Sequence, residues 1–314
     1  MDKKNEAVVQ RYVDILTNGG FKALFGDVNN KDVVISILNV LLPEHRQIAY
    51  IDYLPTELQG PVVDQSKEFH YDFMCRDESG AFFIVELQKY WEDDWFKRCV
   101  SYASRAYDGH NRSGMGYDVP PVYLIGLMED RMHHDDREFW KGKYISEYTF
   151  REKECHDLQE ETIVLIFAEL GRFDKTEHEC VTDLDRMCYL LKNMGRFDKQ
   201  PLWLQEEVYT RIFRACEISR YDRNKQEQVH KDMYDERKMN SIIQTYKDWG
   251  YREGVAEGEA KGKAEGKAEG KAEGKTEAKV EVAVKLLQSG MTLMQVAELT
   301  GLPVDHVKEL MESI

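Results

Sequence analysis

The chain has 314 residues, of which 42% are hydrophobic and 32% charged, a composition typical of a soluble globular protein with material for about two domains. No apolar run approaches the roughly 18 to 20 residues that a membrane-spanning helix needs, and the first residues lack the apolar core of a signal peptide, so we expect a cytoplasmic protein. The net charge of -15 disfavours nucleic-acid binding, although a local basic cleft or a bound cation can act against the overall sign.

Cysteine and histidine spacing gives no sign of a structural metal site. The chain has six cysteines and no Cys-x₂-Cys pair, which argues against structural zinc and against a disulfide framework. His133 and His134 are adjacent, and adjacent side chains diverge on helices and on strands. Because their flanks are charged, we expect both histidines in a solvated loop.

The first 54 residues predict helices and one strand. Residues 7–16 and 21–25 indicate two short helices separated by Gly19 and Gly20. Over residues 31–42, apolar side chains would lie on almost every face of a helix, which predicts a buried helix that ends at Pro43. Residues 48–54 indicate a short strand.

Residues 69–88 predict a β-hairpin. The segments 69–76 and 81–88 are rich in aromatic and branched residues, which favour strands. The Asp-Glu-Ser-Gly sequence between them supplies turn chemistry, because Gly80 can adopt a positive φ. We therefore expect two antiparallel strands.

The register of this hairpin brings two acids together. If the loop has three residues, Arg76 lies opposite Phe82, and counting outward places Asp72 opposite Glu86 with Cβ atoms about 5 Å apart. Side chains alternate along a strand, so Gln88 lies on the same face as Glu86. Two carboxylates and an amide are thus predicted to converge.

Such a pair of carboxylates favours a divalent cation. Two carboxylates at this separation repel each other, and a metal ion between them removes the conflict. Asp72, Glu86 and the Leu87 carbonyl would form half of an Mg²⁺ shell, leaving positions for a phosphodiester and its attacking water. The alternative is a surface hairpin with both acids solvated, but residues 82–87 are too apolar for a solvated edge.

Helices and strands then alternate along the chain. A helix follows to about residue 108, with Arg98, Tyr102 and Arg105 on one face that could meet a phosphate backbone or form a solvated stripe. Predicted strands cover residues 122–128, 145–149 and 162–169, and predicted helices cover residues 183–194 and 202–218 and continue to about 249. This order indicates a mixed sheet between helices.

The remaining residues differ in composition. Residues 251–279 carry glycine at every fourth position and seven basic and seven acidic residues, which indicates a marginal solvated helix or a flexible spacer with a Gly/Ala stripe for helix pairing. Residues 280–314 predict three short helices that begin near Val280, Thr292 and Pro303 and resemble a helix-turn-helix. Two lysines against five acids in this segment favour protein interaction or self-association over DNA binding.

These residues together resemble the PD-(D/E)XK nuclease core, and more narrowly the bacterial recombination-promoting nuclease or putative transposase family, which carries Glu-x-Gln in place of Glu-x-Lys. The similarity covers nearly the whole chain. The similar motifs and residues are 21–26, 38–42, 72–75, 77–80, 85–88, Arg98, Tyr102, 167–170, Phe173 and the glycine-periodic tail. The resemblance implies that Asp72 and Glu86 bind the metal and that Gln88 replaces the usual lysine. The acid that often precedes Phe-Lys in this family is absent from residues 16–20.

We therefore expect an α/β, restriction-endonuclease-like mixed sheet flanked by helices, with a helical C-terminal tail. The expected divisions are a nuclease-like domain (1–249), a repeat spacer (250–279) and a small helical module (280–314). The expected function is that of a metal-dependent DNA endonuclease, which would promote recombination or mobile-element cleavage and self-associate through its tail. The alternative is a nuclease fold that binds nucleic acid or protein without cutting. The expected site residues are Asp72, Glu86 and Gln88 for catalysis, Asp72, Glu86 and Leu87 for Mg²⁺ or Mn²⁺, and Arg98, Tyr102 and Lys22 for phosphate.

Overall fold

The computed structural model describes residues 10–58, 69–109, 117–134 and 137–313. Residue contacts divide the chain into two compact units, residues 1–237 and residues 238–314. None of the described helices combines the length and the apolar character that crossing a bilayer requires.

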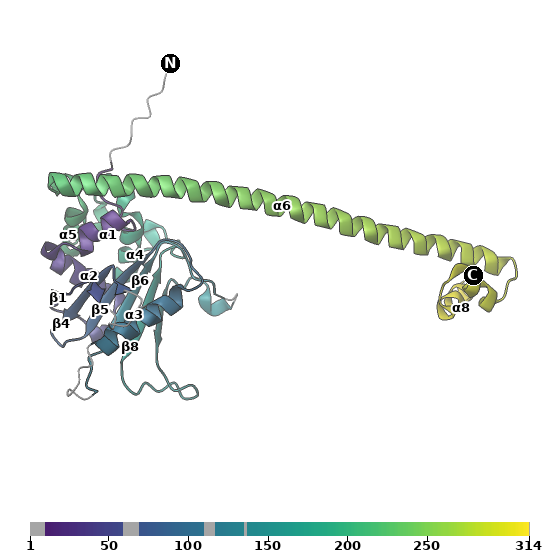
Figure 1. Ribbon diagram of the computed structural model, residues 1–314, viewed down its shortest axis with the longest axis horizontal. Helices are drawn as coiled ribbons and strands as arrows, with labels where there is room; N and C mark the ends of the chain where they lie inside the picture. The colour runs from purple at the N-terminus through teal and green to yellow at the C-terminus, as the bar shows by residue number, and fades with distance from the viewer. Residues whose placement is uncertain (1–9, 59–68, 110–116, 135–136, 314) are drawn as a thin grey trace, which may run out of the picture. The chain divides into compact units, whose positions relative to one another are not determined.

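The first unit is built on a six-stranded mixed sheet (Figure 1). Its strands, in spatial order, are β1 (Ile51–Tyr53), β4 (Phe73–Asp77), β5 (Phe82–Gln88), β6 (Val122–Met128), β8 (Ile163–Glu169) and β7 (Ile145–Thr149). The three central strands β5, β6 and β8 run parallel, and the other neighbouring pairs are antiparallel. A separate two-stranded sheet pairs β2 (Glu57–Leu58) with β3 (Phe69–His70). Because the central strands are parallel, their carboxyl ends meet at one edge of the sheet.

Helices cover both faces of this sheet. The larger apolar cluster joins one face to α1 (Asn18–Phe25), α2 (Lys31–Leu41), α4 (Asp183–Asn193) and α5 (Glu207–Cys216). The smaller cluster joins the other face to α3 (Trp95–Gly109) (Figure 1). The central strands are apolar on both faces, as strands covered on both sides must be. The predicted α/β class with a mixed sheet between helices is confirmed.

A glycine fixes the position of α3 over the sheet. A Cβ at Gly126, in the middle of β6, would lie 2.7 Å from the Phe167 ring and 3.1 Å from the Trp95 ring. Only glycine leaves room for Trp95, the first residue of α3, to pack at this depth. Gly126 pairs with Glu86 in the sheet, so the first turn of α3 begins beside Glu86.

The amino-terminal segment differs from the prediction. Of the helix predicted over residues 7–16, residues 7–9 lie outside the described residues, and residues 10–17 form turns and an isolated bridge. Helix α1 runs through Gly19 and Gly20. The Thr17 side chain caps this helix by accepting a hydrogen bond from the Gly20 N–H. A Cβ at Gly20 would lie 1.8 Å from the Asp14 carbonyl oxygen. The prediction of a break was wrong because Gly20 permits a close backbone approach inside a helix.

The carboxyl-terminal residues are helical. Helix α6 (Arg223–Gln288) includes the whole glycine repeat, so of the two predicted alternatives the structure has the helix. The helix predicted to begin at Val280 is the end of α6, whereas α7 (Leu293–Thr300) and α8 (Val304–Glu312) agree with the sequence. Thr292 caps α7 in a capping box with Gln295. Ala283, Val296, Ala297, Leu302 and Val307 form a small buried cluster in this second unit.

Candidate active site

The predicted hairpin forms, with the predicted register. Strands β4 and β5 pair Arg76 with Phe82 and Phe73 with Val85, and Gly80 has a φ of 87°. The turn is held by Asp77, whose Oδ1 accepts hydrogen bonds from the Ser79 and Ala81 N–H groups, both at 2.9 Å. This local network explains why the chain reverses at this point.

One residue beyond the regular pairing, Asp72 and Glu86 meet as the register requires. The Asp72 N–H donates to Glu86 Oε1 at 3.2 Å, and the Leu87 N–H donates to Asp72 Oδ2 at 2.9 Å. Each carboxylate therefore accepts a hydrogen bond from a backbone N–H at, or directly after, the other acid. Asp72 is exposed, whereas Glu86 is only 5% exposed.

The electrostatics of this pair are unfavourable for two negative charges. Burial raises the pKa of Glu86 to about 8, and the neighbouring Asp72 carboxylate contributes to the increase. The protein around Asp72 desolvates its carboxyl group and raises its pKa, although the Leu87 N–H and the charges of Lys22 and Arg98 oppose this rise. The positive charges near Asp72 and Glu86 therefore do not compensate for two ionised carboxylates.

Gln88 holds an arginine beside the acids. Its Oε1 accepts a hydrogen bond from Arg98 Nη2 at 2.5 Å, and its Nε2 donates to the Tyr90 carbonyl at 2.5 Å. Arg98 also donates from Nη1 to Glu92 Oε2 at 2.6 Å, and its guanidinium lies 4.8 Å from the Trp95 ring centroid. Both ends of the Gln88 amide are thus engaged within the protein, and Arg98 is fixed by three neighbours.

The other predicted phosphate ligands reach the same edge from both faces of the sheet. Lys22 comes from α1 and lies close enough for its charge to oppose the increase in the pKa of Asp72. Tyr102 comes from α3, where burial raises its pKa and Glu86 adds to the increase. The structure therefore brings Lys22, Arg98 and Tyr102 around the acid pair.

Lys89, which follows Gln88 directly, points away from the acid pair. Its Nζ lies 3.4 Å from Glu129 Oε2 and 3.5 Å from Glu236 Oε2. It is held by these two acids on the opposite side of the strand. Arg98 is therefore the basic group that approaches Gln88.

Two features of this edge were missed from the sequence. Glu92, which pairs with Arg98, precedes α3 by three residues and had no recognisable spacing signal. His134 was expected in solvent, but its side chain is 6% exposed, because Nε2 lies 2.8 Å from Glu169 Oε1 and the ring stacks on Trp140 at 3.8 Å. An acid at the end of the apolar strand β8 was the signal that could have indicated a buried partner for a histidine.

The acid pair has the donor chemistry that a hard divalent cation needs. Among the described residues, no group of three or more His, Cys, Asp or Glu side chains is placed to hold a metal. Asp72 and Glu86 could supply two carboxylate ligands. In a β-strand, the N–H and the C=O of one residue point to the same side of the strand. The Leu87 N–H donates to Asp72, so the Leu87 carbonyl also faces Asp72. Mg²⁺ is commonly held by one or two carboxylates with water and phosphate oxygens. The residues fit such an ion, and its charge would offset the repulsion between them.

The arrangement of a mixed sheet with an acid pair at the edge of its central strands is that of a restriction-endonuclease-like nuclease. A family model described as "PD-(D/E)XK nuclease family transposase" matches residues 16–246, more than half of the chain. The chain belongs to this family, as its resemblance predicted, and the match supports a nuclease-type function. No curated protein and no solved structure gives a significant match.

The raised pKa of Glu86 predicts how stability depends on pH without metal. The folded state holds the Glu86 proton up to about pH 8, whereas the ordinary pKa is 4.5. Between these values the folded state binds more protons than the unfolded state, so the contribution of Glu86 to stability decreases as pH rises. We expect the Glu86→Gln variant in EDTA to gain stability relative to the parent between pH 5 and pH 8, by on the order of a few kcal/mol. Urea unfolding at several pH values measures this difference.

The matched control is Glu147→Gln, which removes a carboxylate from an exposed position on β7. Its stability relative to the parent should stay nearly constant over the same range. A difference between parent and Glu86→Gln that does not change with pH would contradict the raised pKa.

Proposed function

We propose that the protein is a metal-dependent DNA endonuclease that hydrolyses a phosphodiester bond at Asp72 and Glu86. The observation that carries this proposal is the close approach of two carboxylates, in which the buried Glu86 has a pKa of about 8 next to the exposed Asp72. A structural role gives no reason to place two repelling acids together, whereas a cation site requires it. Membership of a nuclease family supports the same conclusion.

Asp72, Glu86 and the Leu87 carbonyl would hold Mg²⁺ or Mn²⁺. When bound, this ion would polarise the phosphate and lower the pKa of an attacking water. Asp72, the more exposed acid, faces the solvent from which ion and substrate arrive. Glu86 must lose its proton to act as a ligand, so metal affinity should increase as pH rises toward 8.

Gln88 replaces the lysine of the usual motif and cannot act as a general base. Because both ends of its amide are engaged, its contacts favour a positioning role in which it holds Arg98, over direct orientation of the attacking water. Arg98 can then stabilise the negative charge that develops on the phosphate, since a guanidinium binds phosphate oxygens through paired N–H groups. Lys22 and Tyr102 would steady the same phosphate from α1 and α3.

Substitution of either acid should abolish cleavage while the fold persists. We expect Asp72→Asn and Glu86→Gln to reduce nicking of supercoiled plasmid in Mg²⁺ or Mn²⁺ by at least about 100-fold, because each removes a charged ligand. Thermal melts in EDTA should show both variants at least as stable as the parent, since one of two repelling charges is gone. A large loss of stability would mean that the acids are structural.

The same assay distinguishes the roles of Gln88 and Arg98. Arg98→Gln alone should lose most activity, because the cation is removed. Combining Arg98→Gln with Gln88→Lys exchanges the amide and the cation across the 2.5 Å contact and should recover part of that activity. A double variant as inactive as the single one would show that Gln88 itself has a direct part in the reaction.

The biological occasion that we propose is recombination or cleavage associated with a mobile element, because the family is described as one of transposases. DNA binding without cleavage in every divalent cation would instead support a catalytically inactive nuclease fold that acts as a binding module. The net charge of -15 is the observation that favours this second function.

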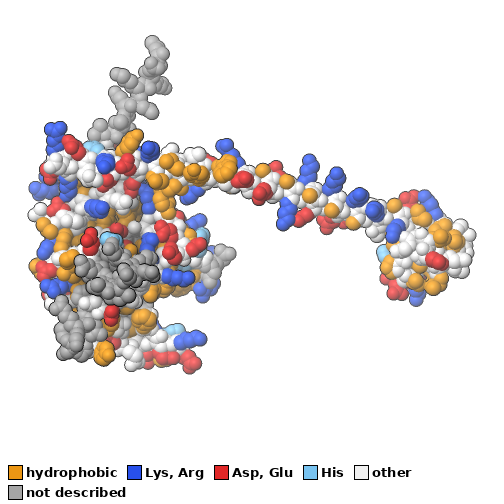
Figure 2. Space-filling view, viewed as in Figure 1, with side chains coloured by type: hydrophobic (Ala, Val, Ile, Leu, Met, Phe, Trp, Pro, Cys, Tyr) orange, Lys and Arg blue, Asp and Glu red, His pale blue; other side chains and the backbone are white. Residues whose placement is uncertain are grey.

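We further propose that the protein self-associates through α6, in the second unit. An exposed apolar stripe on this helix, which we call the 239–249 stripe, has the 3-4-3 spacing of a coiled-coil seam, and its members are Met239, Ile242, Tyr246 and Trp249. These side chains are between 42% and 67% exposed. Hydrophobic side chains show on α6, and both basic and acidic side chains follow along its repeat (Figure 2). A second copy of the chain would present the same stripe, and pairing would shield large side chains that water solvates poorly.

Charges on this stripe should dissociate the protein. The double variant Ile242→Glu, Trp249→Glu is expected to lower the mass measured by light scattering to that of a single chain, because two seam positions become charged. Ser241→Glu is the matched control, since residue 241 is exposed but lies outside the 3-4-3 spacing. Equal masses for the parent and the double variant would contradict the proposal.

A further inference from the structure

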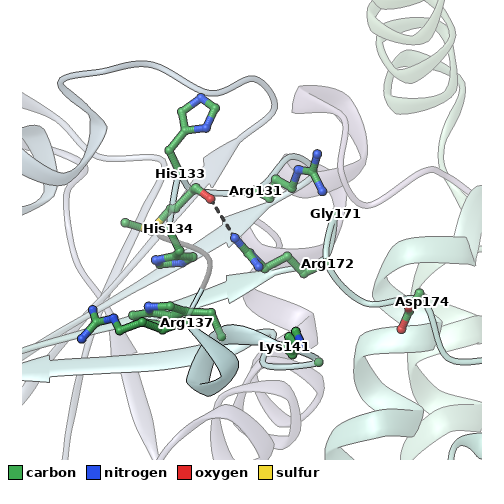
Figure 3. A pocket seen from close by; sticks show the side chains of 11 residues that line it. Arg131, His133, His134, Arg137, Lys141, Gly171, Arg172 and Asp174 are labelled. Atoms are coloured by element: carbon green, nitrogen blue, oxygen red, sulfur yellow. Dashed lines mark hydrogen bonds between the residues drawn. The ribbon is translucent and has the colours of Figure 1, made fainter. Parts of the chain in front are cut away.

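A basic cavity lies at the same edge of the sheet as the acid pair. It has a volume of about 540 Å³ and is lined by four cationic side chains, Arg131, Arg137, Lys141 and Arg172, against the single acid Asp174 (Figure 3). Asp135 and Asp136 lie outside the described residues, so this comparison of charges covers only the lining residues that the structure describes. We call this cavity the basic pocket.

The topology places the basic pocket next to the candidate active site. Its described lining residues lie within 131–134 and 137–142, after β6, and within 171–174, after β8. In the sheet Gln88 pairs with Met128, and Met128 pairs with Glu169, so three parallel strands end together. Neighbouring strands lie about 4.8 Å apart, which puts the end of β8 about 10 Å from the end of β5. A nucleic-acid strand rises about 3.4 Å per nucleotide, so this distance corresponds to a few nucleotides.

A buried carboxylate fixes the walls of the basic pocket. Glu169 is 1% exposed, and its Oε2 accepts hydrogen bonds from the Met132 N–H at 2.8 Å and from Arg172 Nε at 2.9 Å. Its Oε1 lies 2.8 Å from His134 Nε2. Arg172 also donates from Nη2 to the Met132 carbonyl at 3.1 Å (Figure 3). Glu169 thus joins the segment after β6 to the segment after β8, and these hydrogen bonds hold the walls of the pocket in place.

Aromatic contacts continue this surface toward the acid pair. Trp91, three residues after Gln88, donates its backbone N–H to Asp130 Oδ2 at 3.2 Å, and its ring meets that of His133 edge to face at 5.2 Å. The segment after β5 is therefore fastened to the segment after β6. His134 and Trp140 stack at 3.8 Å beside the pocket. The edge from Gln88 to Arg172 forms one connected set of contacts.

We propose that the basic pocket is a phosphate-anchoring subsite, which holds a backbone phosphate of the nucleic acid a few nucleotides from the bond at Asp72 and Glu86. Arginine and lysine side chains around a fixed cavity suit a phosphate group, because guanidinium N–H groups pair with its oxygens. A local site of this kind accounts for how a chain with a net charge of -15 binds a polyanion. This inference rests on the proposed function.

Replacing two exposed cationic residues of the basic pocket with neutral ones tests the inference in the full-length protein. Arg131→Gln with Lys141→Gln should weaken binding of a fluorescent DNA duplex in Ca²⁺, which supports binding without requiring cleavage as the readout. The slope of log affinity against log salt should decrease by about one to two, since this slope counts neutralised phosphates. Arg131 and Lys141 are both exposed, so the substitutions leave the core intact.

The matched control is Arg151→Gln with Lys153→Gln, which changes the net charge equally. These exposed residues follow β7 at Thr149, which pairs with Val164 near the start of β8, so they lie at the opposite edge of the sheet. The control should leave affinity and salt slope nearly unchanged. Equal effects of the two double variants would overturn the proposal, since only overall charge would then matter.

Two further results separate the possible ligands and the two proposals. If inorganic phosphate binds the parent but not the pocket variant, while both bind DNA equally, the pocket takes free anions and the proposal fails. If the parent binds DNA with the predicted pocket dependence but never cuts it, the subsite stands and the endonuclease proposal fails. If the parent cuts DNA and the pocket variant keeps its affinity and salt slope, only the subsite proposal fails.

Discussion

The close approach of Asp72 and Glu86 is the constraint on which the rest of this site depends. Each carboxylate accepts a hydrogen bond from the backbone of the other strand, so the pair is locked by the hairpin itself. The local cost is a Glu86 carboxyl with a pKa of about 8. Strained electrostatics of this kind are retained where a cation or substrate relieves them.

The surrounding fold serves this pair from several directions. The Asp77 turn sets the register, and Gly126 lets Trp95 pack close enough that α3 begins beside Glu86. Arg98, one turn later, then reaches the Gln88 amide. Parallel strands β6 and β8 end at the same edge, where buried Glu169 shapes the basic pocket. The edge that carries the acid pair thus also carries Arg98 and the cationic side chains of the basic pocket.

Sequence reasoning succeeded where local chemistry decides the structure. The hairpin register followed from the turn residues and from the two-residue period of strands, so the meeting of Asp72 with Glu86 was predictable. The strands β6 and β8 were predictable from their continuous apolar runs, and the start of α7 from Thr292 as its N-cap. Contacts that depend on tertiary packing were not predictable. The hydrogen bonds of the Gln88 amide, the ion pair of Glu92 with Arg98 and the contacts that bury His134 each depend on how separate segments pack together, which local sequence does not encode. The helix break predicted at Gly20 was wrong because glycine occurs both at helix breaks and at close backbone contacts.

The most direct test is proton release on metal binding. At pH 7 a Glu86 with a pKa of about 8 is mostly protonated, so a metal that binds both carboxylates must displace close to one proton. Titration calorimetry with Mn²⁺ in two buffers of different ionisation enthalpy measures that number. We expect release of about one proton by the parent and almost none by Glu86→Gln, which should also bind Mn²⁺ more weakly. Mn²⁺ binding of equal affinity to both proteins, with no proton released by either, would contradict this expectation.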